Sequence, residues 1–254
     1  MPNAQPSGAC PNCGASAVGR FCPECGQDNR RRRLEVAPVW ADSIQNLVGW
    51  DSALARTLRG LVADPGALVA DYASGRRRRY VNPARFCLLA LAAWLLVSRL
   101  TGQDAMEFTG IDLSGRADRE SLSSDQLRVQ GFVLSYLDLF LYLSLPLKAL
   151  LLRLFFRSSD RNLAENLVLV FYLAGFGFLL ALLAVPLQVA GIGVVGSIHS
   201  LVTLIWFVRA NRSFQGRGWW ATTWRSFAAA LLHGFGTVVV MLVVAIGWIG
   251  VVGA

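Results

Sequence analysis

Long apolar runs separated by short arginine-rich segments make up the chain beyond residue 80. A helix needs ~20 largely apolar residues to cross the ~30 Å hydrocarbon core of a bilayer, and five segments approach that length. The expected spans are residues 83–100, 131–153, 163–187, 190–208 and 227–251. The pattern therefore predicts a mainly α-helical, polytopic membrane protein with about five transmembrane helices.

The first of these spans is short of apolar residues. Only Phe86–Ser98 is free of charge, so Arg85 and Arg99 must extend their side chains towards opposite interfaces to lengthen the span. Asn82 is placed to cap this helix, and Pro83 suits its first turn because the missing N–H would be unpaired there anyway.

An apolar stripe at helical period precedes the spans, in residues 38–62. Its members are Trp40, Ile44, Leu47, Leu54, Leu58 and Leu61. We expect an amphipathic helix lying in the headgroup interface and anchored by Trp40 and Trp50; docking on a partner protein is the alternative. A second short helix should follow, with Asp64 as its N-cap, Pro65 in its first turn and Gly75 past its end.

Composition agrees with a membrane protein. Of 254 residues, 54% are hydrophobic and 16% are charged, and the mean hydropathy is +0.47, which excludes an ordinary soluble domain. The net charge of +8 alone would be compatible with nucleic-acid binding. However, half of the 24 basic residues precede Phe86 and the later ones cluster between apolar runs, as charges that set membrane topology do.

These charges also predict an orientation. Arginines mark residues 1–82, 154–162 and 209–226 as cytoplasmic, whereas six acidic residues against three basic ones place residues 102–130 outside. The first 30 residues contain no apolar signal sequence. We therefore expect a cytoplasmic N-terminus and a C-terminus on the opposite side.

Residues 8–27 contain two copies of Cys-Pro-x-Cys-Gly, separated by eight residues. Four thiolates at this spacing form a tetrahedral metal site, and a segment without a core of its own would depend on that metal to fold. The pattern predicts one structural zinc ion bound by Cys10, Cys13, Cys22 and Cys25, without Cys87. Disulfides, a redox Cys-x-x-Cys pair and a rubredoxin-like iron site are the alternatives.

Two arginine runs flank the amphipathic stretch. Their members are Arg30, Arg31, Arg32, Arg33, Arg76, Arg77, Arg78 and Arg79. Both runs are expected to contact anionic lipid headgroups. For the first run, a solvated linker is the alternative. Nucleic acid is disfavoured as a partner because no aromatic residue is interleaved with the first run to stack on bases.

Polar residues inside spans are costly and therefore need a reason. Asp138 is the deepest carboxylate and the candidate for a proton or cation site, with a helix–helix hydrogen bond as the alternative. Lys148 and Glu165 are expected to form an interfacial ion pair. His199 and His233 lie among small residues and are expected to be neutral packing histidines.

The order of these features resembles the bacterial DUF3667 family. The resemblance rests on the cysteine pairs ending in Gly26-Gln27, on Asp64-Pro65-Gly66, on Tyr72-Ala73-Ser74-Gly75-Arg76 and on Tyr80-x-x-Pro83. It implies a zinc ribbon (8–28), a linker with interfacial helices (29–80) and a transmembrane domain (81–254), in a bacterial inner membrane and without an assigned function. The five-span layout is also similar, at the level of fold, to the Yip1 membrane domain.

No catalytic motif accompanies these features. The chain contains no H-E-x-x-H, no G-x-S-x-G and no carboxylate pair at catalytic spacing. We expect a non-enzymatic membrane protein whose cytosolic zinc ribbon recruits a protein partner or regulates the membrane domain. A small transporter or channel using Asp138 is the alternative, and an intramembrane enzyme is a more distant one.

Overall fold

The structure is a computed structural model that describes residues 8–17, 19–28, 34, 51–102 and 124–252. Within these ranges, three helices are long and apolar enough to cross a membrane, at Arg77–Thr101, Leu163–Val189 and Trp219–Trp248. They correspond to helices α4 (Pro83–Thr101), α7 (Leu163–Val189) and α9 (Trp219–Val252). The prediction of a helical membrane protein rests on these three helices, whereas a count of five spans stays a prediction.

The two other expected spans are helical but less uniform. Helix α8 (Val195–Gln215) carries two arginines towards its end. The predicted span 131–153 is divided into α5 (Ser124–Leu143) and α6 (Leu145–Phe155). The division falls at Ser144, beside Pro146, which has no N–H to donate and interrupts the helical hydrogen bonds. The span predicted at 131–153 is thus helical with a break at Ser144, and its crossing of the membrane stays a prediction.

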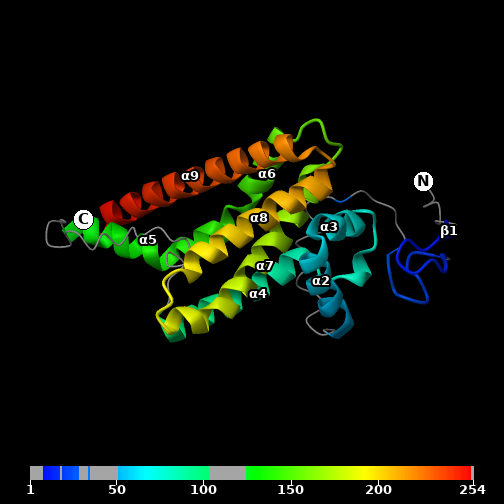
Figure 1. The fold of residues 1–254 in the computed structure, drawn as a ribbon, viewed down its shortest axis with the longest axis horizontal. Coiled ribbons are helices and arrows are strands. Elements are labelled where there is room, and N and C mark those ends of the chain that lie inside the picture. The colour runs from blue at the N-terminus through cyan, green and yellow to red at the C-terminus, as the bar shows by residue number, and fades with distance from the viewer. Residues whose placement is uncertain (1–7, 18, 29–33, 35–50, 103–123, 253–254) are drawn as a thin grey trace.

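The helices run back and forth along one long axis (Figure 1). Helices α4, α7 and α8 lie side by side, and α9 lies along α5 and α6. The connections 156–162 and 216–218 lie at the same end as α2 (Asp51–Ala63) and α3 (Pro65–Ala73), which we call the proximal end. The connection 190–194 and the end of α9 lie at the opposite, distal end.

Glycines allow the closest helix contacts. A Cβ atom at Gly175 of α7 would lie 2.7 Å from Phe86 Cδ1 and 3.0 Å from Cys87 Cα of α4. A Cβ atom at Gly66 of α3 would lie 2.5 Å from the carbonyl oxygen of Ala210 in α8. Small residues let backbones approach in this way in membrane proteins.

The apolar stripe predicted for residues 38–62 is used within the protein. Leu61 is fully buried, and Leu54 and Leu58 pack against the same core. The indole Nε1 of Trp206 donates to the carbonyl oxygen of Leu61 at 2.9 Å, so α2 is fixed to α8. The described part of the stripe thus covers the proximal end of the bundle and is not left open to lipid; Trp40 and Trp50 lie outside the described residues.

The predicted helix caps are confirmed at α3 and at the start of α4. The carboxylate of Asp64 accepts from the N–H of Ala67 at 3.0 Å, and Gly75 follows α3 with a φ of 110°. The side chain of Asn82 accepts from the N–H groups of Ala84 and Arg85, at 3.1 and 3.2 Å. These caps satisfy backbone donors that the helices leave unpaired.

The contact at Gly66 predicts a large effect of one methyl group. Gly66→Ala should destabilise the protein by about 1–3 kcal/mol because α3 and α8 must separate to admit the Cβ atom. Gly234→Ala in α9, where the new atom meets nothing within 4 Å, is the matched control. Thermal unfolding in detergent measures both; equal melting temperatures for the two variants would contradict the close contact.

Candidate metal centre

The N-terminal segment consists of two short hairpins, each with a Cys-Pro-x-Cys-Gly turn. Strands β1 (Gly8–Ala9) and β2 (Ser16–Ala17) pair antiparallel around the first turn. A single bridge between Phe21 and Asp28 closes the second. This is too little structure to enclose a hydrophobic core.

The two turns have the same hydrogen bonds. The N–H of Gly14 donates to the carbonyl of Cys10 at 2.9 Å, and the N–H of Gly26 donates to that of Cys22 at 2.8 Å. Both glycines have positive φ, 79° and 67°, a conformation that side chains disfavour. The repeated Gly in the motif is therefore required by the turn that presents each cysteine pair.

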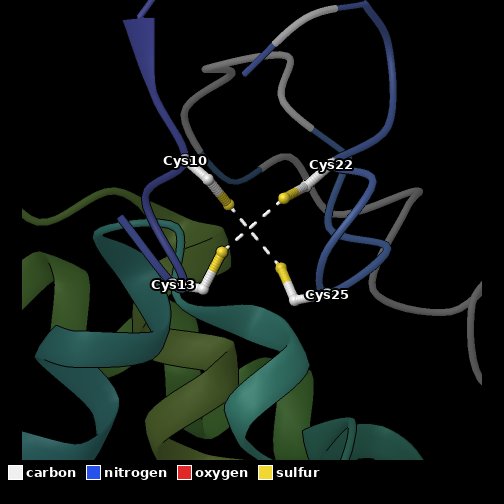
Figure 2. Close-up of side chains that lie close together, drawn as sticks. All are labelled: Cys10, Cys13, Cys22 and Cys25. Atoms are coloured by element: carbon white, nitrogen blue, oxygen red, sulfur yellow. Dashed lines mark hydrogen bonds between the residues drawn. The ribbon is translucent and has the colours of Figure 1, made fainter. Parts of the chain in front are cut away.

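The four thiols converge on one point (Figure 2). Sγ of Cys10 lies 3.7 Å from Sγ of Cys25, and Sγ of Cys13 lies 3.6 Å from Sγ of Cys22. All four sulfur atoms lie within 4.8 Å of one another. A tetrahedral ion with metal–sulfur bonds of ~2.3 Å places its ligands about 3.8 Å apart, so the arrangement fits one metal ion.

The thiols are free rather than joined as disulfides, because bonded sulfurs lie only ~2.05 Å apart. Cys10 and Cys22 are buried, whereas Cys13 is exposed. Although burial opposes the thiolate at Cys25, hydrogen bonds, the largest of them to the backbone at Gln27, lower the pKa of this thiol to about 7. Metals bind the thiolate, so the lowered pKa favours metal binding at this one ligand. At Cys13 a backbone hydrogen bond to Ala15 is outweighed by desolvation and by the neighbouring thiols, which raise its pKa to about 12.

Cys87 takes no part in this cluster. Its side chain is fully buried in α4, where it contacts α7 at Gly175. It acts as a small apolar residue between two helices, as the sequence predicts.

Sequence reasoning missed the contact that holds this segment against the helices. The backbone N–H of Arg78 donates to Oε1 of Gln27 at 3.1 Å, and its Nε donates to the carbonyl of Gly26 at 3.3 Å. Gln27 is buried and directly follows the second turn. The sequence shows only that a glutamine follows Gly26, and its burial could not be read from that position.

The arginine run 76–79 thus makes specific protein contacts. Arg76 pairs with the carboxylate of Asp71 at 2.5 Å, and the carbonyl of Arg79 accepts from Nε of Arg56 at 3.0 Å. The run forms η1 (Arg77–Arg79). Its contact with lipid stays a prediction, and residues 30–33 lie outside the described residues.

The two histidines make hydrogen bonds to other helical segments. His199 of α8 bonds through Nε2 to the carbonyl of Gly177 in α7 at 3.1 Å. His233 of α9 bonds through Nε2 to the hydroxyl of Ser144 at 2.8 Å. Because that hydroxyl donates to the carbonyl of Leu141, His233 donates to Ser144 and holds the α5–α6 break. Asp138 lies in α5, and its side chain is outside the described part.

Lys148 and Glu165 each contact another group in place of the expected ion pair. Glu165 accepts from the N–H of Asn162 at 3.1 Å, while Asn162 accepts from that of Glu165 at 2.8 Å. This capping box begins α7. Lys148 instead places Nζ 4.4 Å from the ring centre of Phe207.

Comparison with protein families gives one match. Residues 51–94 match the family described as "Protein of unknown function (DUF3667)". The resemblance to this family is confirmed. The match covers α2, α3, η1 and the first twelve residues of α4, and it does not extend to the four cysteines of the metal centre. No curated protein and no solved structure matches the chain.

The cysteine geometry predicts a metal stoichiometry. Purified full-length protein should carry one metal ion per chain, and Cys22→Ser should lose it because three thiolates leave the tetrahedron open. Elemental mass spectrometry under reducing conditions measures the content. Cys87→Ala is the control and should retain the metal; equal loss in both variants would contradict the assignment.

Proposed function

We propose that this chain is a non-enzymatic membrane protein whose zinc ribbon, on the cytoplasmic side, recruits a protein partner and regulates the membrane domain. The observation that carries the proposal is the contact of the ribbon with Arg78, at the entrance to α4. The ribbon therefore contacts the N-terminal end of a helical segment that is long enough to span the membrane.

Zinc is the metal we propose. Four thiolates and no open position are typical of a structural zinc site. The cytosol keeps such thiols reduced, and zinc has no redox chemistry that would require a partner protein for electrons. An iron site would be built from the same ligands, so elemental analysis of the purified chain distinguishes the two.

The path from the ribbon into the membrane is short. After Arg78, the N–H of Val81 donates to the hydroxyl of Thr57 at 3.0 Å. The carbonyl of Val81 accepts from the hydroxyl of Tyr172 in α7 at 2.5 Å. A change at the ribbon would therefore act on the segment that fixes α4 to α2 and α7.

We propose that the contact is reversible. Among the described residues, two hydrogen bonds join the ribbon to Arg78, each contributing about 1 kcal/mol in a typical protein. A partner that bound the ribbon would therefore need little binding energy to release it from Arg78. Weak attachment is what a regulated module requires.

The ribbon presents a surface for such a partner. The side chain of Phe21 is 55% exposed, and the guanidinium of Arg20 lies 5.0 Å from its ring centre. Aromatic residues and arginine are enriched at protein interfaces. We propose that Phe21 is the centre of the partner-binding face.

The proposed topology has five spans, with the ribbon in the cytoplasm and the end of α9 outside. Its support is the arginines around the proximal connections 156–162 and 216–218, which the positive-inside rule assigns to the cytoplasm. In a bacterium this membrane is the inner membrane. The proposed partners are then membrane lipids and a protein bound to the ribbon, and nucleic acid is not proposed as a partner.

Hydrogen exchange tests the coupling between ribbon and membrane domain. Removing the metal from the full-length protein should speed amide exchange in residues 76–82, because the ribbon loses its fold and releases Arg78. Residues 195–210 in α8 make no described contact with the ribbon and should exchange as before, so they are the internal control. An unchanged exchange rate at residues 76–82 would contradict the proposed coupling between the ribbon and the membrane domain.

The same full-length protein tests recruitment. A photo-crosslinking amino acid at Phe21 should capture a partner in native membranes, and Cys22→Ser in the same chain should abolish the product. A crosslinker at Trp220, which is 90% exposed on α9, is the control for non-specific capture. A product that persists without the cysteines would contradict recruitment by the folded ribbon.

The topology predicts a difference between two connections. In a cysteine-free chain, Gly218→Cys at the proximal end should react with an impermeant thiol reagent only from the cytoplasmic side. Gly193→Cys at the distal end should react only from outside. Both positions have room for a side chain; labelling of both from one side would mean that α8 does not cross the membrane and would contradict the five-span topology.

A further inference from the structure

An open cavity of about 360 Å³ lies between helices of the bundle, and none of the four clustered cysteines lines it. Helices α4, α6, α7, α8 and α9 contribute Trp94, Lys148, Phe178, Thr203 and Ala230, respectively, to its lining. Its volume is within the range of small-molecule sites, which combine apolar walls with a few polar groups. The lining here has that composition.

The cavity contains an unusual cation. Lys148 is the one lysine among 24 basic residues, and it lines the cavity. Its Nζ lies 4.4 Å from the ring centre of Phe207, while its expected partner Glu165 is occupied in the cap of α7. Among the side chains that the structure describes, no carboxylate forms an ion pair with Lys148.

The depth of Lys148 makes this arrangement costly without a ligand. It lies five residues before Arg153, where the proposed span ends, which is about 7.5 Å along the helix axis. On the proposed topology, that is about a quarter of the way into a ~30 Å hydrocarbon core. An ammonium group at this depth is expensive, and the face of one aromatic ring compensates only part of the cost.

The walls beyond Lys148 are mainly apolar, although His199, Ser200 and Thr203 of α8 also line the cavity. Phe178 and Ala181 of α7 and Leu204 of α8 line the cavity. The polar groups of α8 are partly used within the helix, since Thr203 donates to the carbonyl of His199 at 3.0 Å. The cavity therefore offers a positive charge near its proximal end and hydrocarbon surface deeper in the bundle.

We propose that this cavity binds a membrane amphiphile with an anionic head group, a carboxylate or a phosphate, on an acyl chain. The ammonium of Lys148 holds the head group. The acyl chain lies against Phe178 and Ala181. The site is separate from the ribbon and does not depend on the proposed role of the metal.

The test uses full-length protein in nanodiscs and two photoactivatable probes, a diazirine palmitate and a diazirine phosphatidic acid. At least one probe should crosslink saturably to α7 around Phe178 and Ala181, as mapped by peptide mass spectrometry. The probe that is retained identifies the head group as carboxylate or phosphate. Competition with the unlabelled compound gives the affinity.

Two variants locate the head and the chain. Lys148→Met should weaken binding about tenfold or more, because it removes a charge-assisted hydrogen bond, and Lys148→Arg should restore most of it. Ala181→Phe should block the chain while leaving Lys148 in place. Leu147→Met, at an exposed neighbouring position outside the cavity lining, is the matched control and should bind as the parent does.

Three results would overturn the proposal. The first is labelling that does not saturate and is spread over lipid-facing helices. The second is Lys148→Met and Ala181→Phe proteins that are folded and bind as the parent does. The third is a Lys148→Met protein whose lost stability is restored by Asp138→Asn, because the cation would then serve an ion pair within the protein.

Discussion

Tyr172 connects the parts of this protein that lie far apart in the sequence. Its hydroxyl donates to the carbonyl of Val81, its ring meets that of Tyr72 edge-on at 5.9 Å, and Phe86 packs beside it at 6.0 Å. One buried side chain of α7 thus fixes α3, the link after η1 and the start of α4. A buried phenol without a partner would be destabilising. The segment around Val81 therefore has to lie against α7 in the folded protein, so that its carbonyl can accept from Tyr172.

The features that could be read from the sequence are those set by neighbouring residues. Asp64 and Asn82 cap helices because their side chains reach N–H groups two or three positions on, and the glycines after each cysteine pair fit one turn geometry. The features that could not be read depend on distant segments. The stripe of α2 packs on protein because Trp206 and α7 are there to receive it, and a hydrophobic period does not distinguish protein from lipid.

The metal site shows the same division. Four cysteines at the right spacing predict their own convergence, and the sulfur atoms are indeed gathered around one point. The position of that site on the protein depends on Arg78, whose run was expected to contact lipid only. Its contacts use one backbone donor and one guanidinium donor, and a run of four arginines does not reveal which member binds protein.

Arginines at the proximal end donate hydrogen bonds to carbonyls at the ends of helices, and the same arginines support the proposed topology. Arg209 donates to the carbonyl of Ala63, the last residue of α2, and Arg161 donates to that of Phe214 in the last turn of α8. Helices leave their final carbonyls unpaired, and positive charge is favourable there. A chain inserted in the opposite sense would keep these contacts, since each arginine and its carbonyl lie at the same end of the bundle, but it would place the arginines outside, which the positive-inside rule disfavours. On the proposed topology, the arginines that oppose the inverted orientation are therefore also residues that complete the ends of helices.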